Sequence, residues 1–145
     1  MELSSRVRYA LLALLELARY HEQEGFLQID QIAASHQIPE RYLAQLLMVL
    51  RQGGLVRSQR GAKGGYLLAK SPWQITVSEV LACLEGSKNL KLNPQTVSGT
   101  PESSAIEAVW QEAITAALTV LQRHTLQDLC DKRDENQQSN ITYQI

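Results

Sequence analysis

The chain has few cysteines and no long apolar run, which argues against a disulfide-rich protein and against a membrane-spanning one. Its 145 residues include two cysteines, Cys83 and Cys130, which are too few for a disulfide framework and do not form a Cys-x-x-Cys pair. This scarcity is typical of a reducing compartment, so we expect a cytoplasmic protein. The apolar stretch YALLALLELA is far shorter than the ~20 residues that span a bilayer, and the N-terminus lacks the features of a signal peptide. We therefore expect no membrane partner.

Motifs for catalysis and nucleotide binding are also missing. Residues 57–70, RSQRGAKGGYLLAK, combine glycines with a lysine, but they match neither the phosphate-binding loop nor Gly-x-Gly-x-x-Gly. No Ser/His/Asp or Cys/His arrangement is recognisable. His21 and His36 have no ligand partner at metal spacing, and we expect both to be surface polar residues. The sequence therefore predicts no enzyme, and it predicts another role for the glycine-rich stretch.

Composition favours one globular domain, and charge is distributed unevenly along it. Hydrophobic residues make up 44% and charged residues 20%, which is ordinary for a domain of this size. Residues 1–70 contain nine lysines and arginines against six acids, whereas residues 71–145 contain five against nine. A polyanion bound by the first half would account for this split. From charge alone, a solvated basic face is an equal alternative.

Three helices are expected before the glycine-rich stretch. The first begins at Ser4 or Ser5, and apolar residues recur along it at helical spacing. A second helix, of about two turns, begins near Ile29, and a third has Pro39 in its first turn and ends at Gly53. A short helix, a tight turn and a second helix are the helix-turn-helix pattern. An ordinary helical hairpin with a polar surface is the alternative.

The glycine-rich stretch directly follows the third helix. LVRSQR and GYLLAK are extended runs around a glycine-rich tip, which predicts a β-hairpin. After a helix-turn-helix, such a hairpin is the wing of a winged helix. Arg60 and Lys63 flank its turn and can reach phosphates or a narrow minor groove. A plain solvated turn is the alternative. Trp73 is expected to pack in the core or between elements, and Thr76 or Ser78 to cap a fourth helix.

The second half of the chain is expected to serve assembly. Residues 86–104 are rich in Ser, Thr, Asn, Pro and Gly, which indicates a flexible loop. Residues 105–133 are expected to form a long helix and a short closing helix, and residues 134–145 a flexible tail. The long helix has a broad apolar stripe, which favours a dimer seam over packing within one chain. The stripe consists of Ile106, Val109, Trp110, Ala113, Ile114, Ala117, Leu118 and Leu121.

Three stretches resemble the Rrf-type family of bacterial winged-helix regulators, the group of IscR, NsrR and CymR. SSRVRYALLALLELA is similar to the family's opening helix, and ITVSEVLACLEG to the helix after the wing. IPERYLAQLLMVLRQGGLVRSQRGAKGGYLLAK is similar to its recognition helix and wing, including the signature Arg-Gly-x-x-Gly-Gly-Tyr-x-Leu. The resemblance is close over residues 1–86 and looser afterwards. It implies a mainly α fold with a small β-hairpin, in which residues 1–85 form a winged helix-turn-helix domain and a long C-terminal helix forms a homodimer.

The resemblance also implies a function and a set of contacts. The expected function is sequence-specific binding of double-stranded DNA at a pseudo-palindromic operator, as a transcription regulator and most simply a repressor. Arg41 and Gln45 are also residue types that pair with guanine and adenine in the major groove. The implied contacts are Glu40, Arg41, Tyr42 and Gln45 in the recognition helix, Arg60 and Lys63 in the wing, and Ser5, Arg6 and Tyr9 on the DNA backbone.

The chain departs from the iron–sulfur-sensing members of this family. Those members have three cysteines in the loop before the long helix, and residues 86–104 contain none. An iron–sulfur cluster needs several thiolates held close together, and this loop supplies none. In this respect the chain is similar to the cluster-free branch that CymR represents, and we expect no cofactor. An iron–sulfur regulator with an atypical site, built from Cys83, Cys130 and His124 of two subunits, is the alternative.

Two further partner hypotheses concern the C-terminal region. In the cluster-free branch the signal is thought to arrive through an enzyme of cysteine synthesis, whose active site takes up a C-terminal Ile peptide. Tyr143 to Ile145 therefore form a candidate plug, bound through the carboxylate, with a plain disordered tail as the alternative. A protein-interaction adaptor, which uses the long helix and the tail and has no role on DNA, is the rival function.

Overall fold

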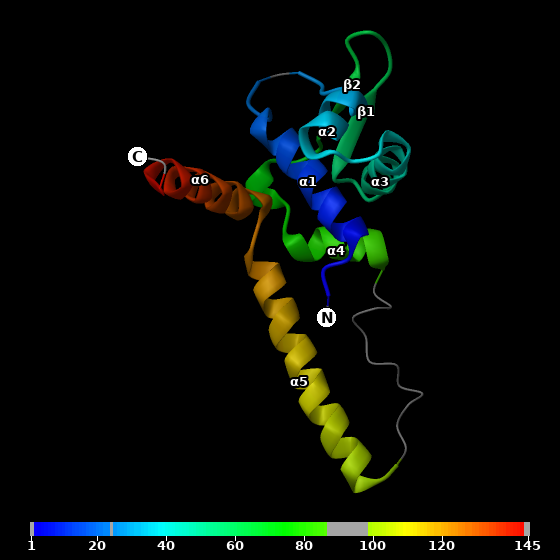
Figure 1. The fold of residues 1–145 in the computed structure, drawn as a ribbon. Coiled ribbons are helices and arrows are strands. Elements are labelled where there is room, and N and C mark those ends of the chain that lie inside the picture. Colours follow the sequence, from blue (N-terminus) through cyan, green and yellow to red (C-terminus); the bar gives the residue numbers. More distant parts are fainter. Residues whose placement is uncertain (1, 24, 87–98, 144–145) are drawn as a thin grey trace.

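The structure is a computed structural model that describes residues 2–23, 25–86 and 99–143, with side chains as far as residue 140. Its elements are α1 (Ser5–Arg19), α2 (Ile29–His36), α3 (Glu40–Gln52), β1 (Val56–Gln59), β2 (Gly65–Leu68), the 3-10 helix η1 (Pro72–Gln74), α4 (Val77–Glu85), α5 (Pro101–Arg123) and α6 (Leu126–Tyr143). Helices α1–α4 and the hairpin gather in one body, α5 extends away from it, and α6 begins back beside it (Figure 1). This arrangement confirms the mainly α fold with a small β-hairpin.

Helix α1 is the centre of the body and packs against α2, α3, α4 and α6. It begins where expected, because the Ser4 hydroxyl accepts a hydrogen bond from the Val7 N–H at 3.2 Å. Val7, Ala10, Leu14 and Leu17, which recur at helical spacing, are buried, and Leu11 and Ala18 are partly buried beside them. Burial of this stripe is the main force that assembles the other helices around α1.

Helices α2 and α3 form the predicted helix-turn-helix. The turn is tight because Gln37 adopts the left-handed conformation, with φ 55° and ψ 42°, and Ile38 then enters the core. Pro39 is the N-cap of α3, one residue before the first turn in which it was expected. Leu43, Leu46, Leu47 and Leu50 anchor α3 in the core. The opposite face of α3 is therefore presented to solvent.

Strands β1 and β2 form the predicted antiparallel hairpin, in which Val56 pairs with Leu68 and Gln59 with Gly65. A third segment was not foreseen: Leu27 and Tyr66 exchange backbone hydrogen bonds of 2.9 and 2.7 Å. Gly65 allows this approach, because it has a φ of +142° and a Cβ there would collide with the Leu27 carbonyl. The part of β2 next to the wing tip is thereby fixed to the segment that leads into α2.

Helix α5 begins at Pro101, earlier than the expected residue 105. Thr100 caps it by accepting a hydrogen bond from the Ser103 N–H at 3.2 Å, and proline suits the first position. Residues 101–104 are thus helical rather than part of a flexible loop. Residues 87–98 of that expected loop lie outside the described part of the chain.

Helix α6 replaces the expected short helix and flexible tail with one continuous helix from Leu126 to Tyr143. Thr125 caps it, because its hydroxyl accepts a hydrogen bond from the Asp128 N–H, and the hydrogen bond from the Thr125 N–H to Asp128 lowers the pKa of that carboxyl. The expectation was wrong because polarity suggested disorder, whereas residues 126–143 contain neither glycine nor proline and are rich in good helix formers. Leu126 is fully buried, so the start of α6 belongs to the core.

Trp73 does not lie in the core, the first of the two positions expected for it. Its side chain is 60% exposed, and its ring meets the His21 ring edge-on with centroids 6.4 Å apart. Trp73 lies in η1, where the neighbouring Pro72 is the buried residue.

Within the described residues, no helix combines the length and apolar character needed to cross a membrane.

Candidate nucleic-acid interface

The N-terminal half of α3 presents polar side chains to solvent. Glu40, Arg41 and Gln45 are all exposed, as expected of side chains that read base edges. Met48 was not foreseen on this surface, and it is 48% exposed. Its spacing of three residues from Gln45 and seven from Arg41 places it on the same helix face, so helical periodicity alone could have found it. An apolar side chain there suits contact with a thymine methyl group.

Tyr42 differs from its exposed neighbours on α3. It is half-buried, and its ring packs edge-on against Tyr9 of α1, with centroids 5.8 Å apart. The family resemblance implied a recognition-helix contact for Tyr42 and a DNA-backbone contact for Tyr9, and the two rings lie against each other. It also fixes the first turns of α3 against α1.

The beginning of α1 forms a second polar region. Ser5 and Arg6 are exposed, and Arg8 adds another exposed cation one residue beyond. The Ser4 hydroxyl, which caps α1, also donates a hydrogen bond to Oε1 of Glu85 on α4 at 3.0 Å. The N-terminus of a helix favours anions, and the arginines strengthen that preference, so this region suits a DNA phosphate.

The wing tip is held in place by polar contacts as well as by its strands. The tip turns through a hydrogen bond from the Gly64 N–H to the Gly61 carbonyl at 2.9 Å, and Arg60 and Lys63 are exposed on either side. The side-chain amide of Gln28, at the start of α2, donates to the Ala62 carbonyl at 3.1 Å. The tip is thus connected to the helix-turn-helix at a fixed distance.

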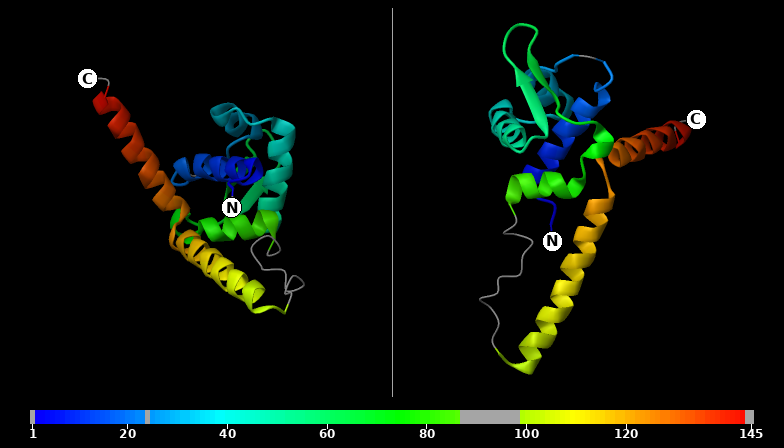
Figure 2. Two further views of the ribbon diagram at one scale, coloured as in Figure 1. Left: turned by 60° about the horizontal axis from the view of Figure 1, so that its bottom comes forward. Right: turned by 180° about the vertical axis from the view of Figure 1, so that it is seen from behind.

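A further contact joins the hairpin to the recognition helix. Arg51, in the last turn of α3, donates from Nη1 to the Ser58 hydroxyl on β1 at 3.1 Å. Helix α3 and β1 also lie side by side in both views of Figure 2 and pack against each other. The recognition helix and the wing therefore form one unit with exposed basic side chains on both.

The predicted apolar stripe of α5 lies mostly in solvent in the single chain. No side chain of α5 is buried. Ile106, Val109 and Trp110 are 69%, 66% and 61% exposed. Ala113 is also exposed, and the remaining members, Ile114, Ala117, Leu118 and Leu121, are half-buried. One chain thus leaves much of this stripe uncovered.

The two cysteines lie on different helices, Cys83 on α4 and Cys130 on α6. The Cys83 thiol on α4 lies against the end of α3 and donates to the Val49 carbonyl at 3.5 Å, and Cys130 is buried on α6. Burial raises the pKa of both thiols, while Arg6 near Cys83 and Arg133 near Cys130 act in the opposite direction. Cluster iron binds thiolates, and these sites favour the protonated thiol. Among the residues that the structure describes, no three His, Cys, Asp or Glu side chains are grouped to hold a metal.

A helix-turn-helix followed at once by a basic hairpin defines the winged-helix class of DNA-binding proteins. The profile of the Rrf2 family, described as "Iron-dependent Transcriptional regulator", matches residues 3–132. The chain belongs to the Rrf2 family. The iron dependence in that description is said of the family and not of this chain.

Individual relatives support the same assignment. The chain is 36% identical to the HTH-type transcriptional regulator CymR of Bacillus subtilis over 143 residues, 99% of either chain. It is 44% identical to IscR of Photorhabdus laumondii over 87 residues, 60% of this chain and 52% of that protein. Among solved structures, B. subtilis CymR matches with a TM-score of 0.79 and 34% identity, covering 91% of this chain and 98% of that one. T. potens IscR matches with a TM-score of 0.78 and 34% identity, covering 94% and 91%. The chain is a DNA-binding transcription regulator that resembles CymR.

Proposed function

We propose that the chain acts in the cytoplasm as a homodimeric repressor that binds a pseudo-palindromic operator, without a catalytic activity. The observation that carries this proposal is the fixed connection between the exposed N-terminal half of α3 and the basic wing tip. Gln28 reaches the tip at Ala62, and Arg51 reaches β1 at Ser58. Both connections keep the two DNA-contacting elements in one orientation.

Each contact has a distinct role in this proposal. Arg60 and Lys63 bind phosphates from the wing, and the start of α1, through Ser5, Arg6 and Tyr9, binds the backbone on the other side of the recognition helix. Arg41 reads guanine, Gln45 reads adenine, and Glu40 accepts from cytosine N4. Tyr42 orients these residues through its ring contact with Tyr9. Phosphate contacts supply affinity, and the α3 contacts supply specificity.

The uncovered stripe of α5 supports the homodimer. Two copies that cross along this helix would bury Val109 and Trp110 together with the half-buried residues that follow them. A dimer with two-fold symmetry places two recognition helices on one face of the duplex. The DNA site then repeats with the same symmetry, which is the reason for proposing a pseudo-palindrome.

Selection from random duplexes tests this proposal directly. We expect the full-length protein to enrich a pseudo-palindrome whose half-sites lie about 10 base pairs apart, centre to centre. Fluorescence anisotropy should then show affinity that falls steeply with salt concentration, because bound phosphates release counterions. An adaptor with no role on DNA would enrich no sequence. Enrichment of a single half-site would contradict the dimeric arrangement.

A partner enzyme of cysteine synthesis is a second proposal, supported by the likeness to CymR. CymR, whose solved structure this chain resembles, is the global cysteine regulator of B. subtilis. In this chain the proposed contact is Tyr143 to Ile145, whose side chains lie outside those described.

Removal of residues 143–145 should therefore weaken binding to the cysteine-forming synthase at least about tenfold in calorimetry, a loss typical of one anchoring side chain. Affinity for the operator should stay the same in this variant. Unchanged affinity for the synthase would contradict the proposal.

A further inference from the structure

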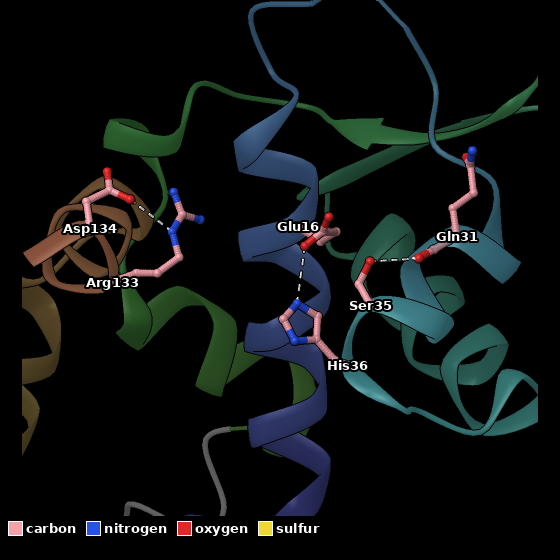
Figure 3. A network of polar contacts seen from close by, with 6 residues as sticks. All are labelled: Glu16, Gln31, Ser35, His36, Arg133 and Asp134. Atoms are coloured by element: carbon pink, nitrogen blue, oxygen red, sulfur yellow. Dashed lines mark hydrogen bonds and ion pairs between the residues drawn. The ribbon is translucent and has the colours of Figure 1, made fainter. Parts of the chain in front are cut away.

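Glu16 is the buried charged residue in the part of the chain that the structure describes. It lies on α1 with 6% of its surface exposed. Its Oε2 lies 3.2 Å from Nε2 of His36 on α2, as Figure 3 shows. His36 was expected to be a surface polar residue, and that expectation is wrong, because its side chain is only 27% exposed and contacts this carboxylate. Burying an unpaired carboxylate costs much free energy. The contact with His36 reduces this cost, so it stabilises the packing of α2 against α1.

The pair lies at the point where the helix-turn-helix reverses direction. His36 is the last residue of α2, Gln37 makes the left-handed turn, and Pro39 begins α3. The start of α2 is held by the contact of Gln28 with Ala62, and the middle of the helix by the buried apolar side chains of Ile32 and Ala33. Apolar contacts are non-directional, whereas a hydrogen bond fixes both a distance and an angle. The Glu16–His36 pair therefore defines the orientation of the end of α2 from which the recognition helix departs.

We propose that Glu16 and His36 are positioning residues for base recognition. Their hydrogen bond sets the orientation of α2, and through the turn at Gln37 that of α3, relative to α1. Neither side chain contacts DNA in this role. The inference rests on the proposed function, because it concerns the base contacts of Arg41 and Gln45. The hairpin also packs against α1 through β2, so we expect its phosphate contacts to depend less on the pair than the base contacts of α3 do.

The experiment compares two duplexes of equal length, the operator selected by the wild-type protein and a scrambled version. Binding to both is measured by anisotropy with full-length protein, and the ratio of the two dissociation constants is the readout. His36→Ala should lower this ratio about tenfold, comparable to the loss of contacts with one base pair. Affinity for the scrambled duplex should change less than about twofold, because phosphate contacts supply non-specific binding.

His36→Gln provides the rescue. Glutamine places an amide nitrogen where the imidazole Nε2 lies, so this variant should recover the wild-type ratio within about twofold. His21→Ala is the matched control, because it removes the same side chain from a position next to Trp73, beyond the end of α1. The ratio for this control should equal that of the wild type.

A double variant separates positioning from stability. Glu16→Met with His36→Leu replaces the pair by apolar side chains, a change that often leaves a fold as stable as before or more so. We expect a melting temperature at or above that of the wild type together with the lowered ratio. A folded double variant or His36→Ala protein with the wild-type ratio overturns the inference. Equal weakening on both duplexes, or failure of His36→Gln to rescue, also overturns it. A wild-type protein that does not prefer its selected duplex would instead refute the proposed function itself.

Discussion

Replacing Arg60 and Lys63 together by alanine should weaken operator binding roughly 50-fold near 0.1 M salt, because each phosphate contact adds a slope of about −0.9 to the salt dependence. The plot of log affinity against log salt should therefore become shallower by about two. Both side chains are exposed at the wing tip, so the fold should tolerate their loss. Anisotropy titrations at four or more salt concentrations measure the affinity and the slope together.

The matched control for the wing removes the same charge from another surface. Arg123→Ala with Lys132→Ala deletes two exposed cations from α5 and α6, far from α3 in the fold (Figure 1). This variant should keep the affinity and the slope of the wild type within about twofold, because charges beyond a Debye length of ~10 Å are screened. Equal weakening in the two double variants would mean that net charge, and not the wing, determines binding.

A charge on the apolar stripe of α5 should separate the proposed dimer. Val109 is 66% exposed in the single chain, so Val109→Asp removes little packing within it. In the dimer the same change would place a carboxylate in an apolar seam, which is strongly unfavourable. We expect sedimentation to show a monomer at micromolar concentration and operator affinity to fall by about 100-fold or more, since one half-site is bound without the other.

Ala108→Asp is the control for the stripe. Residue 108 is exposed and precedes Val109 by one position, which places it on a different face of the helix. The added charge and its depth in the helix are the same, and the control costs at least as much helix stability, because alanine is a better helix former than valine. This variant should remain dimeric and bind the operator like the wild type. A dimeric Val109→Asp protein would show that the stripe has another role.

The sequence predicted the elements whose signals are local. Apolar spacing and a capping serine located α1, and the double glycine after α3 and the glycine-rich tip located the helix end and the hairpin. The exposed face of α3 followed from the same periodicity, since Leu43, Leu46 and Leu47 had to face the core. These features depend on residues within a few positions of each other, which is why one sequence sufficed.

The features that were missed depend on contacts between distant residues. Glu16 and His36 are 20 positions apart, and the residues next to each of them in the sequence do not indicate that the two side chains meet. The pairing of Leu27 with Tyr66 is likewise visible only once the hairpin has folded against α2. Helix α6 was misjudged for a different reason, because its outer turns have no apolar face and polar composition was taken as a sign of disorder. Local propensity, without glycine or proline, was the better guide there.

The junction between α5 and α6 makes the two halves of the chain thermodynamically inseparable. Leu126 donates its backbone N–H to the Ile75 carbonyl, and Val77 donates to the His124 carbonyl, both at 2.9 Å. Ile75 and Leu126 are both fully buried. A fragment cut at residue 85 would expose Ile75 and strip these partners from the start of α4. We therefore expect melting to be a single cooperative event, in which the DNA-binding half unfolds together with the start of α6.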